Sequence, residues 1–172
     1  MALSIKPYIE NKERIHLIGI GGVSMNSLGE LLLSRGVPIS GSDRLRTDVT
    51  ARLEALGAKI TYEHKPENVE GASLIVRTAA VHDENPEIVR AHELGIPVME
   101  RAEAWGHLMR DYDNVVCLAG THGKTTTSSM LASVLDGMGE DPTFLIGGIV
   151  RAYGTNAHSG AGRHYVVEAD ES

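Results

Sequence analysis

The sequence predicts an α/β protein in which a domain built on a parallel sheet is followed by a second, incomplete α/β domain. Short apolar runs alternate with amphipathic stretches along the chain, as strands alternate with helices in such folds. One glycine-rich turn, at residues 19–24, follows the first apolar run, and another, at residues 119–126, follows a later one. These turns favour a Rossmann-like first domain and a P-loop second domain.

Five strands and their connecting helices are expected in the first domain. Leucines recur at helical spacing after the first turn, and Gly36 ends that helix. Asn85 and Pro86 begin a later helix, because Asn is a good N-cap and Pro suits the first helical position. The expected strands are 15–20, 37–40, 58–61, 73–77 and 96–99, and the expected helices are 24–35, 49–56, 85–95 and 101–110. Right-handed crossovers place such helices on both faces of a parallel sheet.

A second unit is expected to begin after the polar turn at residues 111–114, so that the domains are 1–112 and 113–172. Its expected strands are 115–119, 144–146 and 165–167, and its expected helix is 124–138. Residues 147–163 are rich in Gly, Ala, Asn and His, which is typical of a mobile loop. Because a nucleotide-binding α/β domain usually needs about 100 residues, this unit is expected to be the N-terminal part of a truncated domain.

Composition excludes several classes of protein. The hydrophobic share of 42% and charged share of 23% are ordinary for a globular chain and argue against disorder. A net charge of -7 argues against a nucleic-acid partner, and no apolar stretch approaches the roughly 20 residues needed to span a bilayer. The one cysteine, Cys117, has no second cysteine to pair with, which is typical of a reducing compartment. A cytoplasmic protein without a membrane partner is expected.

The first glycine-rich turn, Gly19-Ile20-Gly21-Gly22-Val23-Ser24, predicts a diphosphate site. Glycines let the backbone approach the phosphates, and the helix N-terminus carries about half a positive elementary charge. Asp43 follows about 20 residues later, where an acid can accept a hydrogen bond from a ribose hydroxyl. Ser24 replaces the third glycine of the dinucleotide fingerprint. A turn that serves packing alone and an NAD-dependent oxidoreductase are the alternatives at this point.

The second turn, residues 119–126, combines the parts that phosphoryl transfer needs. Backbone amides would surround the phosphates, Lys124 would neutralise the outer ones, and the Thr125 hydroxyl would bind Mg²⁺. The strict P-loop pattern requires Gly where this chain has Leu118, so the loop is of a shortened type. Glu168 directly follows an apolar strand, where an acid can face the same metal. A simple helix cap and a solvated acidic turn are the respective alternatives.

Seven sequence runs resemble the Mur ligases in the same order: IHLIGIGG, SGSD, VTARLEALGAKI, NPEIV, AGTHGKTTT, DPTFLIGG and VVEADES. The resemblance covers nearly the whole chain from Arg14 to Ser172, and GTHGKTT and EADES are its most specific pieces. The resemblance implies a UDP-sugar-binding domain, an ATP-binding central domain, and a third domain that brings the amino acid. It implies an ATP-dependent ligase of peptidoglycan synthesis that activates UDP-N-acetylmuramate as an acyl phosphate and joins it to L-alanine. The 172 residues alone are expected to bind nucleotide without completing catalysis.

The resemblance also assigns roles by matching position. The UDP-sugar would contact Gly21, Gly22, Val23, Ser24, Asp43, Thr78, Ala79 and Ala80. The ATP phosphates would contact Gly120, Thr121, His122, Gly123, Lys124, Thr125 and Thr126, with Lys124 as the catalytic residue and Thr125 and Glu168 as Mg²⁺ ligands. The family usually has Gly at position 24 and Ser at positions 78 and 79, so the uridine contacts are expected to differ. A murein tripeptide ligase of the same family and a UDP-sugar-binding module without catalysis remain alternatives.

Overall fold

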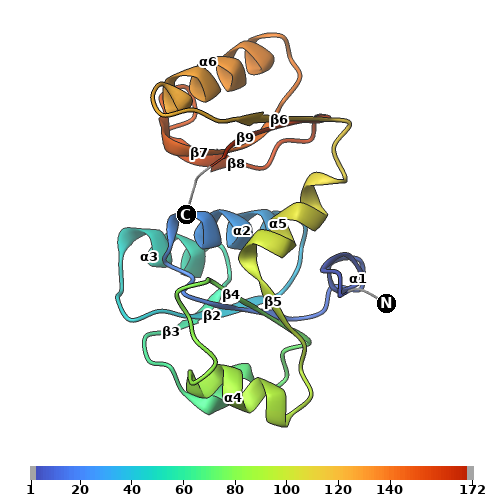
Figure 1. The fold of residues 1–172 in the computed structure, drawn as a ribbon, viewed down its shortest axis with the longest axis vertical. Helices are drawn as coiled ribbons and strands as arrows, with labels where there is room; N and C mark the ends of the chain where they lie inside the picture. The colour runs from blue at the N-terminus through green and yellow to red at the C-terminus, as the bar shows by residue number, and fades with distance from the viewer. Residues whose placement is uncertain (1–2, 170–172) are drawn as a thin grey trace. The chain divides into compact units, whose positions relative to one another are not determined.

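The computed structural model describes residues 3–169 and divides into two compact units, Met1–Leu108 and Met109–Ser172. We refer to them as unit 1 and unit 2 and describe each by itself (Figure 1). Both are α/β, as the alternating apolar pattern predicts. Among residues 3–169, no helix is both long enough and apolar enough to cross a membrane.

Unit 1 is built on a parallel five-stranded sheet in the order β3-β2-β1-β4-β5. Its strands are β1 (Ile15–Ile18), β2 (Ile39–Ser42), β3 (Lys59–Thr61), β4 (Leu74–Arg77) and β5 (Val98–Glu100). The five predicted strands are therefore confirmed, although β2 begins and ends two residues later than predicted. The strand order reverses between β1 and β4, which places a topological switch point at their carboxyl ends.

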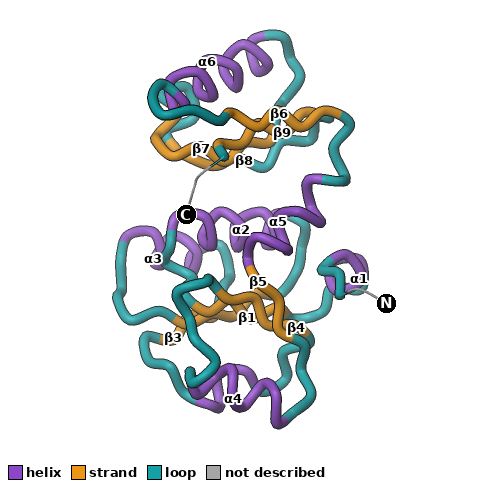
Figure 2. The backbone as a smooth tube through the Cα atoms, in the orientation of Figure 1, coloured by secondary structure: helices purple, strands orange, loops and turns teal. Residues whose placement is uncertain are grey.

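The helices of unit 1 cover both faces of this sheet. They are α1 (Lys6–Glu10), α2 (Val23–Ser34), α3 (Asp48–Ala55), the 3₁₀ helix η1 (Pro66–Val69), α4 (Pro86–Glu93) and α5 (Arg101–Met109). Figure 2 shows α2, α3 and α5 on one face and α4 on the other. Ile18 and Ile75 of the sheet and Ile88 of α4 are fully buried in one cluster, which fixes α4 against the strands. The short elements α1 and η1 were not predicted.

Two caps explain where helices of unit 1 begin. Thr47 accepts a hydrogen bond from the backbone N–H of Thr50, whose side chain in turn accepts from the N–H of Thr47, so α3 starts with a reciprocal capping box. Asn85 Oδ1 accepts from the N–H of Glu87 at 2.8 Å, which caps α4 ahead of Pro86 as predicted. The second cap also brings Glu87 to the first turn of α4.

Unit 2 is a mixed four-stranded sheet in the order β6-β9-β7-β8, with α6 (Lys124–Gly137) packed against it. Its strands are β6 (Asn114–Leu118), β7 (Thr143–Val150), β8 (Thr155–His158) and β9 (His164–Glu168). Strands β6, β9 and β7 are parallel, and β8 is antiparallel to β7. A hydrophobic cluster between the sheet and α6 contains Phe144, Val166 and Ala132.

The predicted loop at residues 147–163 is wrong for residues 147–150 and 155–158, which form strands, whereas residues 151–154 and 159–163 are turns or irregular. Strand β7 continues to Val150, and the chain then turns back to pair as β8. Gly154 has a φ of +65° in the turn, and Val150 and Ala157 are buried. Small and polar residues gave this hairpin no alternating apolar pattern, so pairing with β7 decided its structure rather than local hydrophobicity.

Candidate functional site

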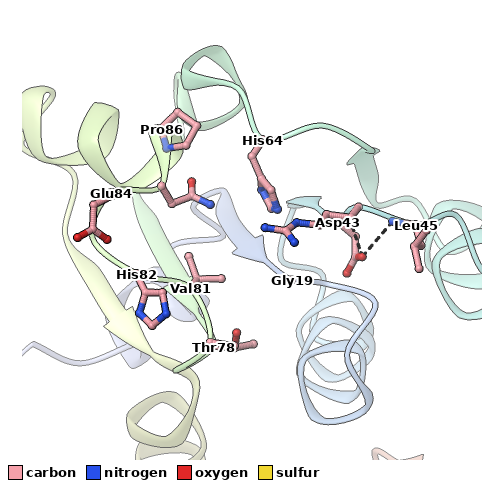
Figure 3. A pocket seen from close by; sticks show the side chains of 12 residues that line it. Gly19, Asp43, Leu45, His64, Thr78, Val81, His82, Glu84 and Pro86 are labelled. Atoms are coloured by element: carbon pink, nitrogen blue, oxygen red, sulfur yellow. Dashed lines mark hydrogen bonds between the residues drawn. The ribbon is translucent and has the colours of Figure 1, made fainter.

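A pocket of about 740 Å³ opens at the carboxyl edge of the unit 1 sheet. Gly19 after β1 and Thr78 after β4 both line it, so it lies at the switch point where α/β proteins bind ligands. Figure 3 shows Asp43 on one side, His82 on the other, and His64 projecting inward between them. Of the residues predicted to contact a UDP-sugar, Asp43, Thr78 and Ala80 line this pocket.

The Asp43 carboxylate is engaged by the backbone around it. Oδ2 accepts from the N–H of Gly21 at 2.8 Å, and Oδ1 accepts from the N–H groups of Arg44 at 2.7 Å and Leu45 at 3.2 Å. A Cβ at position 21 would lie 2.8 Å from Oδ2, so glycine there makes room for the carboxylate. Asp43 thus ties the first glycine-rich turn to the end of β2, a role that the sequence did not predict.

Two N–H groups of the turn that was predicted to bind a diphosphate are already engaged within the protein. The N–H of Gly21 donates to Asp43, and that of Gly22 donates to the carbonyl of Gly19 at 3.1 Å. The N–H groups of Val23 and Ser24 lie in the first turn of α2, where a helix offers no internal acceptor. Since Gly22 provides no side-chain cap, these two amides form the anion-attracting end of the helix.

Several pocket residues were missed from the sequence, including Arg44, His64, His82 and Glu84. They lie in the segments that follow β2, β3 and β4. Their position directly after buried strands was the available signal, because loops at the carboxyl ends of parallel strands share one edge of the sheet. Ala79, Gly21, Gly22, Val23 and Ser24, by contrast, are not among the described residues that line it.

In unit 2, the second glycine-rich turn connects β6 to α6. Gly120 and Gly123 have φ values of +153° and +78°, which side-chain-bearing residues rarely adopt, and Gly123 is the N-cap of α6. Lys124 Nζ donates to the carbonyl of Gly120 at 2.6 Å, so the ammonium lies at the turn itself. The turn, the helix N-terminus and the lysine together make a strongly anion-attracting site.

Thr125 and Glu168, the predicted metal ligands, are brought together from α6 and β9. Thr125 Oγ1 donates to Glu168 Oε2 at 3.2 Å, and Ser128 Oγ lies 2.7 Å from Glu168 Oε1. Ser128 is fully buried and was missed from the sequence; its place one helical turn after Lys124 was the signal. A Cβ at Gly147 of β7 would lie 2.8 Å from Glu168 Oε2, so the space beside the carboxylate depends on glycine.

The donor chemistry of this pair fits Mg²⁺. A threonine hydroxyl and a carboxylate are hard oxygen ligands, and Mg²⁺ commonly takes only one or two from protein and the rest from phosphate and water. Within residues 3–169 there is no group of three or more His, Cys, Asp or Glu that could hold a metal by itself. Asp170, Glu171 and Ser172 of the EADES run lie outside the described residues.

A second pocket, of about 600 Å³, lies within unit 2. Thr125 and Thr126 line it from the start of α6, and Ile149 and Arg151 line it from the region of the β7–β8 hairpin. Helix α6 therefore borders a cavity, and the β7–β8 hairpin, which was predicted as a loop, forms its other wall.

Comparison with known proteins identifies relatives along nearly the whole chain. Residues 14–113 match the family described as Mur ligase family, catalytic domain. The chain is 50% identical over 160 residues to UDP-N-acetylmuramate–L-alanine ligase of Geobacter sp. (strain M21), an alignment that covers 93% of this chain and 34% of that protein. It therefore spans about a third of the length of this relative.

Two solved structures also match this chain over more than nine tenths of its length. The UDP-N-acetylmuramate-alanine ligase MurC from Thermotoga maritima matches with a TM-score of 0.82 and 35% identity, over 91% of this chain and 37% of that chain. UDP-N-acetylmuramate:L-alanyl-gamma-D-glutamyl-meso-diaminopimelate ligase from Neisseria meningitides matches with a TM-score of 0.82 and 31% identity, over 92% of this chain and 53% of that chain. The fold, the order of its motifs and these matches agree, and the chain belongs to the Mur ligase family.

Proposed function

We propose that this chain is the nucleotide-binding part of an ATP-dependent ligase that joins L-alanine to UDP-N-acetylmuramate in cytoplasmic peptidoglycan synthesis. The observation that carries the proposal is the convergence of Lys124, Thr125 and Glu168 at a glycine-rich turn before α6. The 50% identity to a relative with this named activity supports the choice of substrates. Carboxylate, ATP and amine would give amide, ADP and phosphate through an acyl phosphate.

The chemical requirement on unit 2 is electrostatic. A carboxylate must approach a polyphosphate of the same charge, so positive groups have to be in place before the reaction. We assign Lys124 and the N–H groups of residues 120–126 to the ATP phosphates, and Thr125 and Glu168 to Mg²⁺. When bound, the metal would neutralise negative charge on the phosphates. We assign His122 to shaping the turn.

The pocket of unit 1 suits the other nucleotide. Its position at the switch point and the free first-turn amides of α2 support a diphosphate and a nucleoside in neighbouring places. We assign Gly21, Gly22, Val23 and Ser24 to the diphosphate side, and Asp43, Thr78, Ala79 and Ala80 to the nucleoside side. Asp43 would act there mainly through the turn that it ties to β2.

A second candidate is a ligase for a murein tripeptide. The TM-score of 0.82 to the Neisseria meningitides enzyme equals that to the Thermotoga maritima enzyme, so the fold of this part does not separate them. An assay of the full ligase with L-alanine and with tripeptide as alternative amine substrates separates the two.

Thermal-shift titration of the chain tests the proposal directly. Ligand at a hundred times its Kd stabilises a protein by about 2.7 kcal/mol, which raises Tm by several degrees in a protein of this size. UDP-N-acetylmuramate and ATP with Mg²⁺ are each expected to give such a shift, and NADH is expected to give none. A shift with NADH alone would instead support the oxidoreductase alternative and contradict the ligase.

Gly147→Ala is expected to weaken binding of ATP with Mg²⁺ by roughly tenfold, as about 1–2 kcal/mol of crowding would. The added Cβ would lie 2.8 Å from Glu168 Oε2 and displace the carboxylate from Thr125. Isothermal titration calorimetry measures the change. Gly137→Ala is the matched control in the same unit, because nothing lies within 4 Å of its added Cβ. If the Gly147 variant and the control bound ATP with Mg²⁺ equally well, Glu168 would not be part of the binding site.

A further inference from the structure

Next to the unit 1 pocket lies a buried carboxylate to which the proposed function assigns no role. Glu87, in the first turn of α4, has a fully buried side chain. Charged carboxylates are almost never fully buried unless they are paired. Its partners come from four other segments of the chain: β1, β2, the loop after β3, and η1. Burying such a polar cluster costs free energy unless its groups are paired with one another, and this cluster lies beside the pocket.

The cluster is well connected. Glu87 Oε2 accepts from Ser42 Oγ at 2.7 Å and lies 2.8 Å from His64 Nδ1. Glu87 Oε1 accepts from Asn68 Nδ2 at 2.6 Å and lies 3.3 Å from His16 Nε2, which is not aligned for a hydrogen bond. Among these side chains, that of His64 is 18% exposed and lines the pocket, whereas those of Glu87 and His16 are 0% and 1% exposed. His64 therefore connects the buried carboxylate to the pocket.

The carboxylate is ionised at neutral pH. Burial by itself raises the pKa of Glu87, but the neighbouring His16 and the hydrogen bonds from Asn68, Ser42 and His64 together outweigh it and lower the pKa below its usual value. An ionised carboxylate only accepts hydrogen bonds. The contact at 2.8 Å consequently requires a proton on Nδ1 of His64.

We propose that Glu87 is a positioning residue that holds His64 in the Nδ1–H tautomer, so that Nε2 accepts a hydrogen bond from the nucleoside in the pocket. The two ring nitrogens point apart, and within the described part of the chain the hydrogen bonds of His64 all run through Nδ1. His64 projects into the pocket in Figure 3. A neutral imidazole with Nδ1 protonated has an acceptor at Nε2.

The group that His64 recognises is thus a hydrogen-bond donor. On a uridine nucleotide, donors of this kind are the imide N–H of the base and the hydroxyls of the ribose. This step rests on the proposed function, because it takes the nucleotide of unit 1 to be a uridine diphosphate. The tautomer itself follows from the contacts of Glu87 and does not depend on which ligand binds.

NMR of the chain labelled with ¹⁵N-histidine tests the tautomer without any ligand. At pH 8, long-range ¹H–¹⁵N spectra are expected to show Nδ1 of His64 protonated and Nε2 unprotonated. His64→Gln identifies the signal by removing it. A protonated Nε2, either as the other tautomer or as an imidazolium, would overturn the proposal.

Glu87→Gln supplies a matched, nearly isosteric change. Asn68 Nδ2 also donates to the carbonyl of Glu63 at 2.8 Å, so it stays a donor and selects the oxygen of the new amide. The new NH₂ then faces His64 Nδ1, and His64 is expected to shift to the Nε2–H tautomer. An unchanged tautomer in the folded variant would show that Glu87 does not control it. If the variant does not fold, the spectrum of the wild-type protein still decides which ring nitrogen of His64 carries the proton.

Calorimetry with UDP tests the acceptor role. His64→Ala is expected to weaken UDP binding about tenfold, which is the usual contribution of one hydrogen bond. His92→Ala is the control, because His92 is exposed on α4 and does not line the pocket. N3-methyl-UDP and 2′-deoxy-UDP distinguish the donors, since the analogue lacking the recognised donor binds wild type and His64→Ala equally. Equal UDP affinity of wild type and His64→Ala overturns the acceptor role. Failure of UDP to bind wild type overturns the proposed function as well, while the tautomer result stands separately.

Discussion

Replacing Lys124 by alanine is expected to lower ATP turnover of the full ligase by at least about a hundredfold and to leave binding of the UDP-sugar unchanged. Removing one preorganised group that stabilises developing charge typically costs a factor of 10² to 10³. Lys124 Nζ lies 2.6 Å from the carbonyl of Gly120, at the turn that would surround the phosphates. Since ATP and the carboxylate substrate of the proposed reaction are both anionic, the loss of Lys124 leaves their repulsion without the main counter-charge.

The two proposed nucleotide sites belong to different units, so turnover of ATP and binding of the UDP-sugar can be measured independently. Release of phosphate measures turnover, and calorimetry with UDP-N-acetylmuramate measures the site in unit 1. Lys59→Ala is the control for a lost lysine charge, because Lys59 is exposed on β3 of the other unit. If Lys124→Ala reduced both activities equally, the assignment of ATP to unit 2 and UDP-sugar to unit 1 would be wrong.

The second large effect is on stability. Glu87→Ala is expected to lower the free energy of unfolding of unit 1 by about 3–5 kcal/mol, because it leaves the buried partners of the carboxylate without an acceptor. Glu93→Ala, on the same helix, is the matched control. Glu93 is exposed and pairs with Arg90 at 2.9 Å, and a surface pair of this kind contributes at most about 1 kcal/mol.

Urea unfolding followed by tryptophan fluorescence measures this difference. The chain has one tryptophan, Trp105, which is 6% exposed within unit 1 and so reports on that unit. Equal midpoints for Glu87→Ala and Glu93→Ala would mean that the buried cluster contributes no net stability.

The pKa of Glu87 adds a pH dependence to the same measurement. Its folded pKa is lowered from 4.5, because the hydrogen bonds exceed the effect of burial. A lowered folded pKa gives stability that is complete above the unfolded value and is lost as pH falls through the folded value. Wild type is therefore expected to lose more stability than Glu87→Gln below pH about 4.5. Parallel curves for the two proteins would contradict an ionised Glu87.

The main features of the fold could be predicted because they depend on local patterns. Strands β1 and β4 of unit 1 are short, mainly apolar runs, and the helices of unit 1 have apolar residues at helical spacing or a recognisable cap such as Asn85. The glycine-rich turn before α6 could be predicted equally well, since residues 119–126 form one contiguous stretch of the sequence. Thr125 and Glu168 were paired correctly because both lie at the carboxyl side of parallel strands.

Other features arise only when distant segments meet. Asp43 binds the N–H of Gly21, which lies 22 residues earlier, and the β7–β8 hairpin forms by pairing that no apolar alternation announced. The Glu87 cluster draws side chains from five segments, and a glutamate in the first turn of a helix ordinarily indicates exposure. Apolar periodicity records how much surface a segment buries, and therefore which element it forms. It does not record which polar groups will face one another after burial, because those partners are selected by the packed chain in three dimensions.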